Sequence, residues 1–210
     1  MLLNLSVIIA SLGLGACASM TSTQTARTLA PGKTEQSVGV GQYNTNYKGT
    51  DGEEVKASGP FFEYSYRRGL TEAIDFGAKL TIIGTVTLDG KYSLVEADKF
   101  AMSIGAGAGY VSISSGSGDN EAETTIIDLF VPLILSYDFA PNFSLYAAPR
   151  YLIRTFTGAS EGSVGYVGGS GGVKIGNTWG AYLEVAQFSP ADDEYDDVTQ
   201  YAASIFWSGN

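Results

Sequence analysis

The sequence predicts an all-β fold, an up-and-down antiparallel transmembrane β-barrel of about ten strands, and three observations carry that prediction. The 210 residues include 27 glycines and 13 tyrosines, and only 16% of them are charged. From residue 36 onward, apolar and polar side chains alternate between turn signals, without the period of an amphipathic helix. Short and longer connections then alternate along the chain, as they do in membrane barrels.

The alternating pattern divides the chain into ten segments. They span 36–47, 60–69, 73–86, 90–96, 99–113, 124–138, 142–156, 163–176, 179–188 and 197–207. Tight joints separate some of them, at 70–72, 97–98, 139–141 and 177–178, and longer polar connections separate others, at 48–59, 114–123, 157–162 and 189–196. One outer connection is short, around Leu88-Asp89-Gly90, because Asp-Gly is a hairpin turn signal. If the segment 90–96 is misread, the strand number becomes eight or twelve.

The segment 124–138 shows the two faces most clearly. Its odd positions, from Thr125 to Tyr137, are mainly apolar, whereas its even positions include Asp128 and Ser136. A strand of about ten residues, rising roughly 3.3 Å each and tilted by about 40°, covers the roughly 25 Å apolar band of a membrane barrel. We therefore expect the apolar faces to contact lipid. Aromatic residues near strand ends would form interfacial girdles, namely Tyr66, Tyr137, Trp179, Tyr201 and Trp207.

Charged side chains on the opposite faces should line the lumen. The set consists of Glu63, Arg67, Asp75, Lys79, Asp128, Arg150, Arg154, Lys174 and Glu184. Four are acidic and five are basic, so the sum is nearly neutral. Such charges should pair in a narrow barrel, because an unpaired buried charge costs several kcal/mol. We predict a lumen filled by salt bridges, with a proton or substrate path as the alternative.

The N-terminus has the features of a leader. Residues 4–16 form an apolar run that is too short for a lasting membrane helix but suits a signal peptide. The run ends in Leu14-Gly15-Ala16-Cys17, which resembles the lipobox of bacterial lipoproteins. The resemblance implies removal of residues 1–16 and a covalent lipid on Cys17. The alternatives are an ordinary secretory signal cut nearby and a buried structural cysteine. Residues 17–35 are rich in Ser and Thr and are expected to form a flexible tether, followed by a barrel over 36–210.

From Gln36 to its end, the chain resembles small outer-membrane β-barrel proteins of Gram-negative bacteria. The segment from Tyr64 to Lys79 carries the resemblance best, because a Gly-Leu-Thr turn joins two alternating strands there. The resemblance implies outer-membrane lipid, lipopolysaccharide and the barrel assembly machinery as partners. It also implies that the acidic loops face outside, and the lipobox resemblance adds a lipid anchor on the periplasmic side.

Composition excludes several function classes. The chain has no histidine, which rules out mechanisms that need an imidazole base or ligand. A net charge of −10 provides no cationic patch for nucleic acid. The carboxylates of Glu63, Asp128 and Glu184 belong to no recognisable catalytic motif, and each has a basic candidate partner. We therefore expect no enzyme activity and no cofactor apart from the lipid.

The predicted outer connections hold 13 of the 22 acidic residues. The densest group is Asp192, Asp193, Glu194, Asp196 and Asp197. Carboxylate oxygens on a flexible loop suit Ca²⁺, but the spacing matches no complete EF-hand loop. The expectation for this group is therefore weak Ca²⁺ binding.

The sequence thus favours a structural or surface-interaction role for an outer-membrane barrel with a closed, charge-paired lumen. One alternative is a small-solute channel, which would conduct ions. Another is a lipocalin-like carrier tethered by its lipid, whose interior would be apolar and whose exterior would be polar. The alternating faces favour the reverse arrangement.

Overall fold

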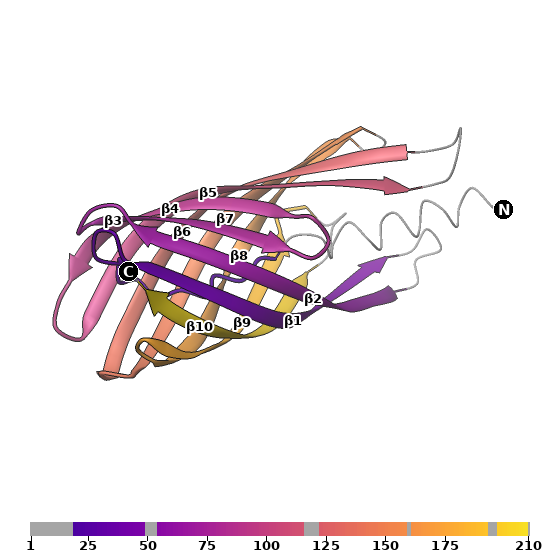
Figure 1. Cartoon of the computed structure of the whole chain (residues 1–210). Helices are drawn as coiled ribbons and strands as arrows, with labels where there is room; N and C mark the ends of the chain where they lie inside the picture. Colours follow the sequence, from indigo (N-terminus) through magenta and orange to yellow (C-terminus); the bar gives the residue numbers. More distant parts are fainter. Residues whose placement is uncertain (1–18, 49–53, 116–121, 159–160, 193–196, 210) are drawn as a thin grey trace.

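The chain forms a closed barrel of ten antiparallel strands in a computed structural model, which describes residues 19–48, 54–115, 122–158, 161–192 and 197–209. The strands are β1 (Thr34–Lys48), β2 (Glu54–Gly69), β3 (Ile74–Thr81), β4 (Val86–Glu96), β5 (Phe100–Ser115), β6 (Ala122–Ala140), β7 (Phe143–Gly158), β8 (Gly162–Gly176), β9 (Trp179–Pro190) and β10 (Val198–Gly209). Each strand pairs with its sequence neighbours, and β1 pairs with β10 to close the barrel (Figure 1). The predicted ten-stranded up-and-down fold is confirmed.

Connections of two kinds lie at opposite ends of the barrel. Short turns follow β2, β4, β6 and β8 at one end, called the short-turn end below. The connections after β1, β3, β5, β7 and β9 lie at the other end, called the long-connection end, and they range in length from 159–161 to 191–197.

The predicted turn around Leu88-Asp89-Gly90 is wrong. The connection between β3 and β4 instead occupies residues 82–85, and Gly84 adopts a left-handed φ of +88° there. The amide of Gly84 donates to the carbonyl of Thr81 at 3.0 Å, which closes the turn. Because glycine adopts this conformation without steric cost, Gly84 provides the turn, and Asp89 becomes a residue within β4.

Apolar side chains cover the outside of the barrel. In β7, Leu145, Tyr151 and Ile153 are exposed, whereas Arg150 and Arg154 are buried inside. Every strand carries exposed large apolar side chains of this kind within its described residues. An apolar exterior around an interior that holds many charged side chains is the arrangement of a membrane-spanning barrel. It contradicts the lipocalin-like alternative, which needs the opposite distribution.

Aromatic side chains gather at the short-turn end. Trp179 and Trp207 are cross-strand partners on β9 and β10, and their rings stack with centroids 5.8 Å apart. Tyr137 contacts Phe139 edge to face at 4.8 Å. Tyr137 and Trp179 are exposed, as interfacial aromatics should be.

Inside the barrel, some aromatic rings lie over glycines of the adjacent strand. Gly41 lies beneath Phe61, and Gly107 lies beneath its cross-strand partner Phe130. A Cβ atom at either glycine would overlap the ring. These glycines therefore make room for the aromatic residues that fill the barrel.

We expect Gly107→Ala to destabilise the barrel by about 1–3 kcal/mol, because the Phe130 ring must move away. The matched control is Gly90→Ala, where the nearest atom to the new methyl group would be the Asp75 carbonyl oxygen at 3.9 Å. The measurement is the urea concentration at which each purified barrel unfolds in detergent. Equal midpoints for the two variants would contradict this packing role.

Candidate functional site

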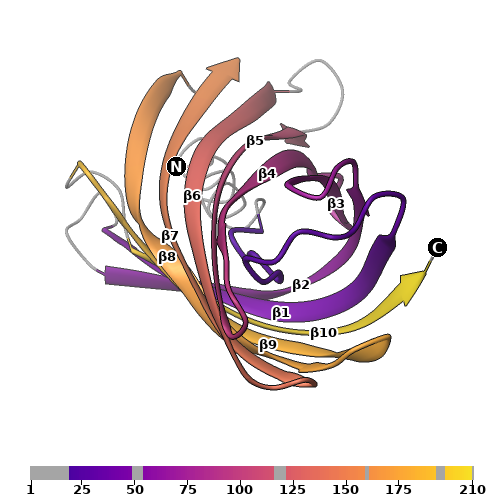
Figure 2. The ribbon, with the colours of Figure 1, turned by 90° about the vertical axis from the view of Figure 1, so that its left-hand side faces the viewer.

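Residues 19–30, called the lumen segment below, lie inside the barrel. Figure 2, seen from the short-turn end, shows this stretch within the ring of strands. An exposed turn over 31–33 joins it to β1, and the Gly32 amide donates to the Gly69 carbonyl at 2.9 Å. The expected tether over 17–35 is therefore not what the structure shows from Ser19 to Lys33. Small Ser, Thr and Ala side chains suit a linker and a narrow lumen equally well, which explains the error.

The wall of the barrel binds the amide groups of the lumen segment. The Ser22 and Thr23 amides both donate to the Glu184 carboxylate, at 2.5 and 2.6 Å. Three further amide contacts are Met20 to Gln200 (2.8 Å), Ala26 to Ser136 (3.3 Å) and Leu29 to Asp75 (3.2 Å). These acceptors come from β3, β6, β9 and β10, so the segment is held from several sides.

The wall also binds the carbonyl groups of the same segment. Lys91 Nζ donates to the carbonyls of Thr25 and Arg27, both at 2.8 Å. Further donors are Lys79 to Thr21 (2.8 Å), Arg150 to Met20 (3.1 Å) and Ser103 to Ala26 (2.8 Å). Cations and hydroxyls of the wall thus complement carbonyls, just as its carboxylates complement amides.

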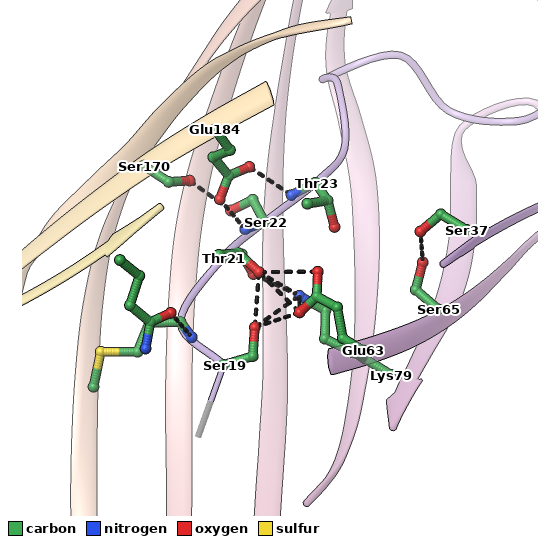
Figure 3. A network of polar contacts seen from close by, with 12 residues as sticks. Ser19, Thr21, Ser22, Thr23, Ser37, Glu63, Ser65, Lys79, Ser170 and Glu184 are labelled. Atoms are coloured by element: carbon green, nitrogen blue, oxygen red, sulfur yellow. Dashed lines mark hydrogen bonds and ion pairs between the residues drawn. The ribbon is translucent and has the colours of Figure 1, made fainter. Parts of the chain in front are cut away.

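Glu63 and Lys79 form the centre of a polar cluster in the lumen (Figure 3). Their charged groups are 3.3 Å apart. The hydroxyls of Ser19 and Thr21 donate to the Glu63 carboxylate, at 2.5 and 3.1 Å. The ion pair on the wall is therefore completed by side chains of the lumen segment.

Two longer side chains anchor the lumen segment. Met20 is buried among apolar residues of β7 to β10, in the half of the barrel nearer the long-connection end. Arg27 lies at the short-turn end, where Nε donates to Asp138 at 2.5 Å and Nη1 donates to Glu96 at 3.2 Å. Nη2 donates to the carbonyls of Ala97 and Asp98. Burial opposes this charge, but Asp138 and then Glu96 outweigh it, so the pKa of Arg27 is raised above its ordinary value.

Most of the predicted lumen charges form ion pairs on the wall. Arg154 binds Asp128 through two hydrogen bonds of 2.8 Å. The other pairs are Arg67 with Asp75 and Asp89 (2.5 Å each), Lys79 with Glu63 (3.3 Å), Lys91 with Asp75 (3.3 Å) and Lys174 with Glu35 (2.8 Å). Sequence reasoning missed Glu35, Asp89 and Lys91. Asp89 and Lys91 alternate with outward residues of β4, and this period-two spacing is the sequence signal that could have placed them in the lumen.

Arg150 and Glu184 depart from the predicted pairing. Arg150 donates to the Met20 carbonyl and to the Ser22 hydroxyl, at 3.1 and 2.6 Å. Its guanidinium also lies 4.9 Å from the centre of the Phe130 ring. Glu184 accepts from the Tyr146 hydroxyl at 2.5 Å, in addition to the two segment amides. Both residues therefore make polar contacts with the lumen segment, and Glu184 also accepts from the wall residue Tyr146.

Two cavities inside the barrel, both lined by described residues, differ in size. A cavity of about 710 Å³ opens at the short-turn end, between Arg27, Lys91, Lys99 and Lys174. Deeper inside, beside Ser22 and Thr23, a second cavity measures only about 20 Å³. That volume is about enough for one water molecule.

Two predicted sites fall wholly or partly outside the described residues. The lipidation site Cys17 lies outside them, as do Asp193, Glu194 and Asp196 of the predicted Ca²⁺ group. Among the described residues, no three potential ligands converge on a metal position. Ca²⁺ binding therefore stays a prediction. No helix in the described part of the chain is long and apolar enough to cross a membrane.

Fold and lumen together define a closed ten-stranded barrel with an apolar exterior and, within the described residues, a segment of its own chain inside. No family model matches the sequence, and no curated protein matches it.

Several solved barrel structures are similar to this chain. One is Ail, the attachment invasion locus protein of Yersinia pestis, in complex with the heparin analogue sucrose octasulfate (12% identity over 85% of this chain and 99% of that chain, TM-score 0.47). Another is the outer membrane protease OmpT of Escherichia coli (11% identity over 88% of this chain and 100% of that chain, TM-score 0.46). A third is an outer membrane channel of Pseudomonas putida F1 (9% identity over 90% of this chain and 100% of that chain, TM-score 0.47). At such low identities and TM-scores, these structures assign no activity, ligand or partner to this chain.

Proposed function

We propose that this chain is a bacterial outer-membrane barrel whose lumen is closed by its own residues 19–30, and that its role is structural or surface-interacting. The placement of the lumen segment carries the proposal, since amides and carbonyls along it are bound by wall side chains.

The exterior supports the membrane location. Large apolar side chains are exposed on every strand, and aromatic residues gather near the short-turn end. In barrels of this kind, short turns face the periplasm and longer loops face outside. We therefore place the short-turn end in the periplasm. Lipid and lipopolysaccharide would contact the apolar wall, and the barrel assembly machinery would insert it.

The interior supports closure over conduction. A pore for small solutes needs a continuous water path with a lining suited to the solute. Here the lumen segment occupies the middle of the barrel, where the cavity beside Ser22 is about 20 Å³. The wall charges around it are engaged in ion pairs or in contacts with the segment.

The buried carboxylates are occupied in ways that support a non-catalytic role. Asp128 is held by Arg154, and Glu63 by Lys79 and two segment hydroxyls. Glu184 accepts from Tyr146 and from two amides. A general acid or base needs access to a substrate proton, and these contacts leave little room for one.

The lumen segment restricts where a lipid on Cys17 could lie. Ser19 donates a hydrogen bond to Glu63, which lies within β2 inside the barrel. The rest of the lumen segment separates Ser19 from the turn at the short-turn end. A lipid on Cys17 that enters the periplasmic leaflet would therefore require Ser19 to leave this position. Ordinary secretory cleavage near Ser19 is compatible with the filled lumen.

The proposal is tested on membranes from cells that express the chain, labelled with a palmitate analogue. We expect detergent extraction from the outer-membrane fraction, a gel mobility that changes on boiling, and no conductance in planar bilayers. Palmitate label that is lost in Cys17→Ser would show lipidation and would contradict a lumen filled by residues 19–30, so we expect no such label. Release without detergent, or steady conductance by the intact chain, would contradict the proposal.

A further inference from the structure

We propose that the lumen is a binding site for an extended peptide, and that residues 19–30 are its resident occupant. The ligand class is a peptide with small polar side chains between an apolar residue and, seven positions later, a basic residue. This inference concerns recognition by the lumen wall and goes beyond the closure of the barrel.

The first argument is that the wall recognises the main chain. Glu184 accepts from two successive amides, and Lys91 donates to two carbonyls of the segment. Gln200, Ser136 and Ser103 add further main-chain contacts. Because every peptide without proline offers the same amides and carbonyls, these contacts can hold segments of different sequence.

The second argument is that two sockets set the register. Met20 fills an apolar socket that includes Leu152 and Phe188. The Arg27 guanidinium fills a socket made by Asp138, Glu96 and two carbonyls. Between them, the side chains from Thr21 to Ala26 are small apart from Gln24. The sockets therefore select one apolar and one basic side chain at a fixed separation.

The third argument is that the resident side chains fit the wall incompletely. Among the described residues, buried side-chain atoms that lack a hydrogen-bond partner include Thr23 Oγ1, Gln24 Oε1 and Arg150 Nε. The first two belong to the lumen segment, and Arg150 contacts it. Buried polar groups are normally satisfied, as the bidentate Arg154–Asp128 pair is. The wall is thus better matched to the backbone of the segment than to its side chains.

The segment can also be separated from the barrel without cutting a strand. Pro31, Gly32 and Lys33 are exposed, and β1 begins only at Thr34. A protease-recognition sequence inserted between Pro31 and Gly32 would allow cleavage after the full chain has folded.

The experiment adds a fluorescent peptide of sequence SMTSTQTARTLA, which copies residues 19–30, to the cleaved barrel in detergent. We expect saturable binding, measured by anisotropy, that the uncleaved protein does not show. Proline at the peptide positions of Ser22 and Thr23 should weaken binding by at least about tenfold, because proline lacks the N–H groups that donate to the Glu184 carboxylate. Glutamate in place of Arg27 should have a similar effect, because it would face Asp138.

On the barrel side, Glu184→Gln should weaken binding by at least about tenfold, and the exposed Glu161→Gln is the matched control. The peptide variants give the same test if Glu184→Gln fails to fold, because they leave the barrel unchanged. The proposal is overturned if the cleaved segment never exchanges with added peptide. It is equally overturned if the emptied lumen takes up no peptide, or if the proline peptide binds as well as the parent.

Discussion

Deletion of residues 19–30 is expected to turn a non-conducting barrel into one that passes ions across a planar bilayer. The deletion removes the chain that occupies the middle of the lumen, where the cavity lined by Ser22 and Thr23 is about 20 Å³. It also frees Arg150 and Glu184, whose polar contacts include the segment, to face water in the opened path. We expect conductance to rise by at least about tenfold over the intact chain.

The control for the deletion is Pro31→Ala in the exposed turn, which leaves the lumen segment in place and should stay closed. The gel mobility change on boiling establishes that each variant is folded. A folded deletion variant that still fails to conduct would mean that the ion pairs of the wall close the barrel by themselves. The sequence-based hypothesis of a lumen filled by salt bridges would then replace the segment as the cause of closure.

Arg154→Met is expected to destabilise the barrel by about 3–5 kcal/mol, because it leaves the buried Asp128 carboxylate without its cation. Arg154 is one of the most deeply buried large side chains, at 1% exposure, and it binds Asp128 through two hydrogen bonds. The measurement is the free energy of unfolding in urea, in detergent or lipid.

The double variant Asp128→Asn with Arg154→Met is the matched test of this cause. It removes both charges, so most of the lost stability should return. If the double variant is no more stable than Arg154→Met, then packing of the arginine stem, rather than the unpaired carboxylate, accounts for the loss.

The strands could be predicted because each has a lipid side and a lumen side. In β6, for example, Leu129 and Val131 point outward while Asp128 points inward, and this arrangement produces a period-two alternation of apolar and polar residues in the sequence. The turn between β3 and β4 could not be placed in the same way. Two possible turn positions, Gly84 and Asp89-Gly90, lie only a few residues apart in the sequence. The apolar residues Ile82 and Ile83, which are exposed in the structure, favour a strand that continues through the actual turn.

The lumen segment could not be predicted for a different physical reason. Its contacts run largely through main-chain amides and carbonyls, which every sequence possesses, so no periodicity marks them. The sequence does predict that Arg150 and Glu184 line the lumen, but their observed partners are backbone groups and hydroxyls. Partners of that type cannot be read from a pattern of charged residues.

The most direct measurement is the rate at which a single cysteine in the lumen segment reacts with a water-soluble maleimide. In a Cys17→Ser background, Ser22→Cys changes a buried hydroxyl to a thiol of similar shape, and Lys33→Cys provides the exposed control in the adjacent turn. If residues 19–30 fill the lumen, the cysteine at 22 should react on the order of 100-fold more slowly in the folded barrel, and equally fast after boiling. Equal rates in the folded barrel would show that the segment lies outside and that the lumen is closed in another way.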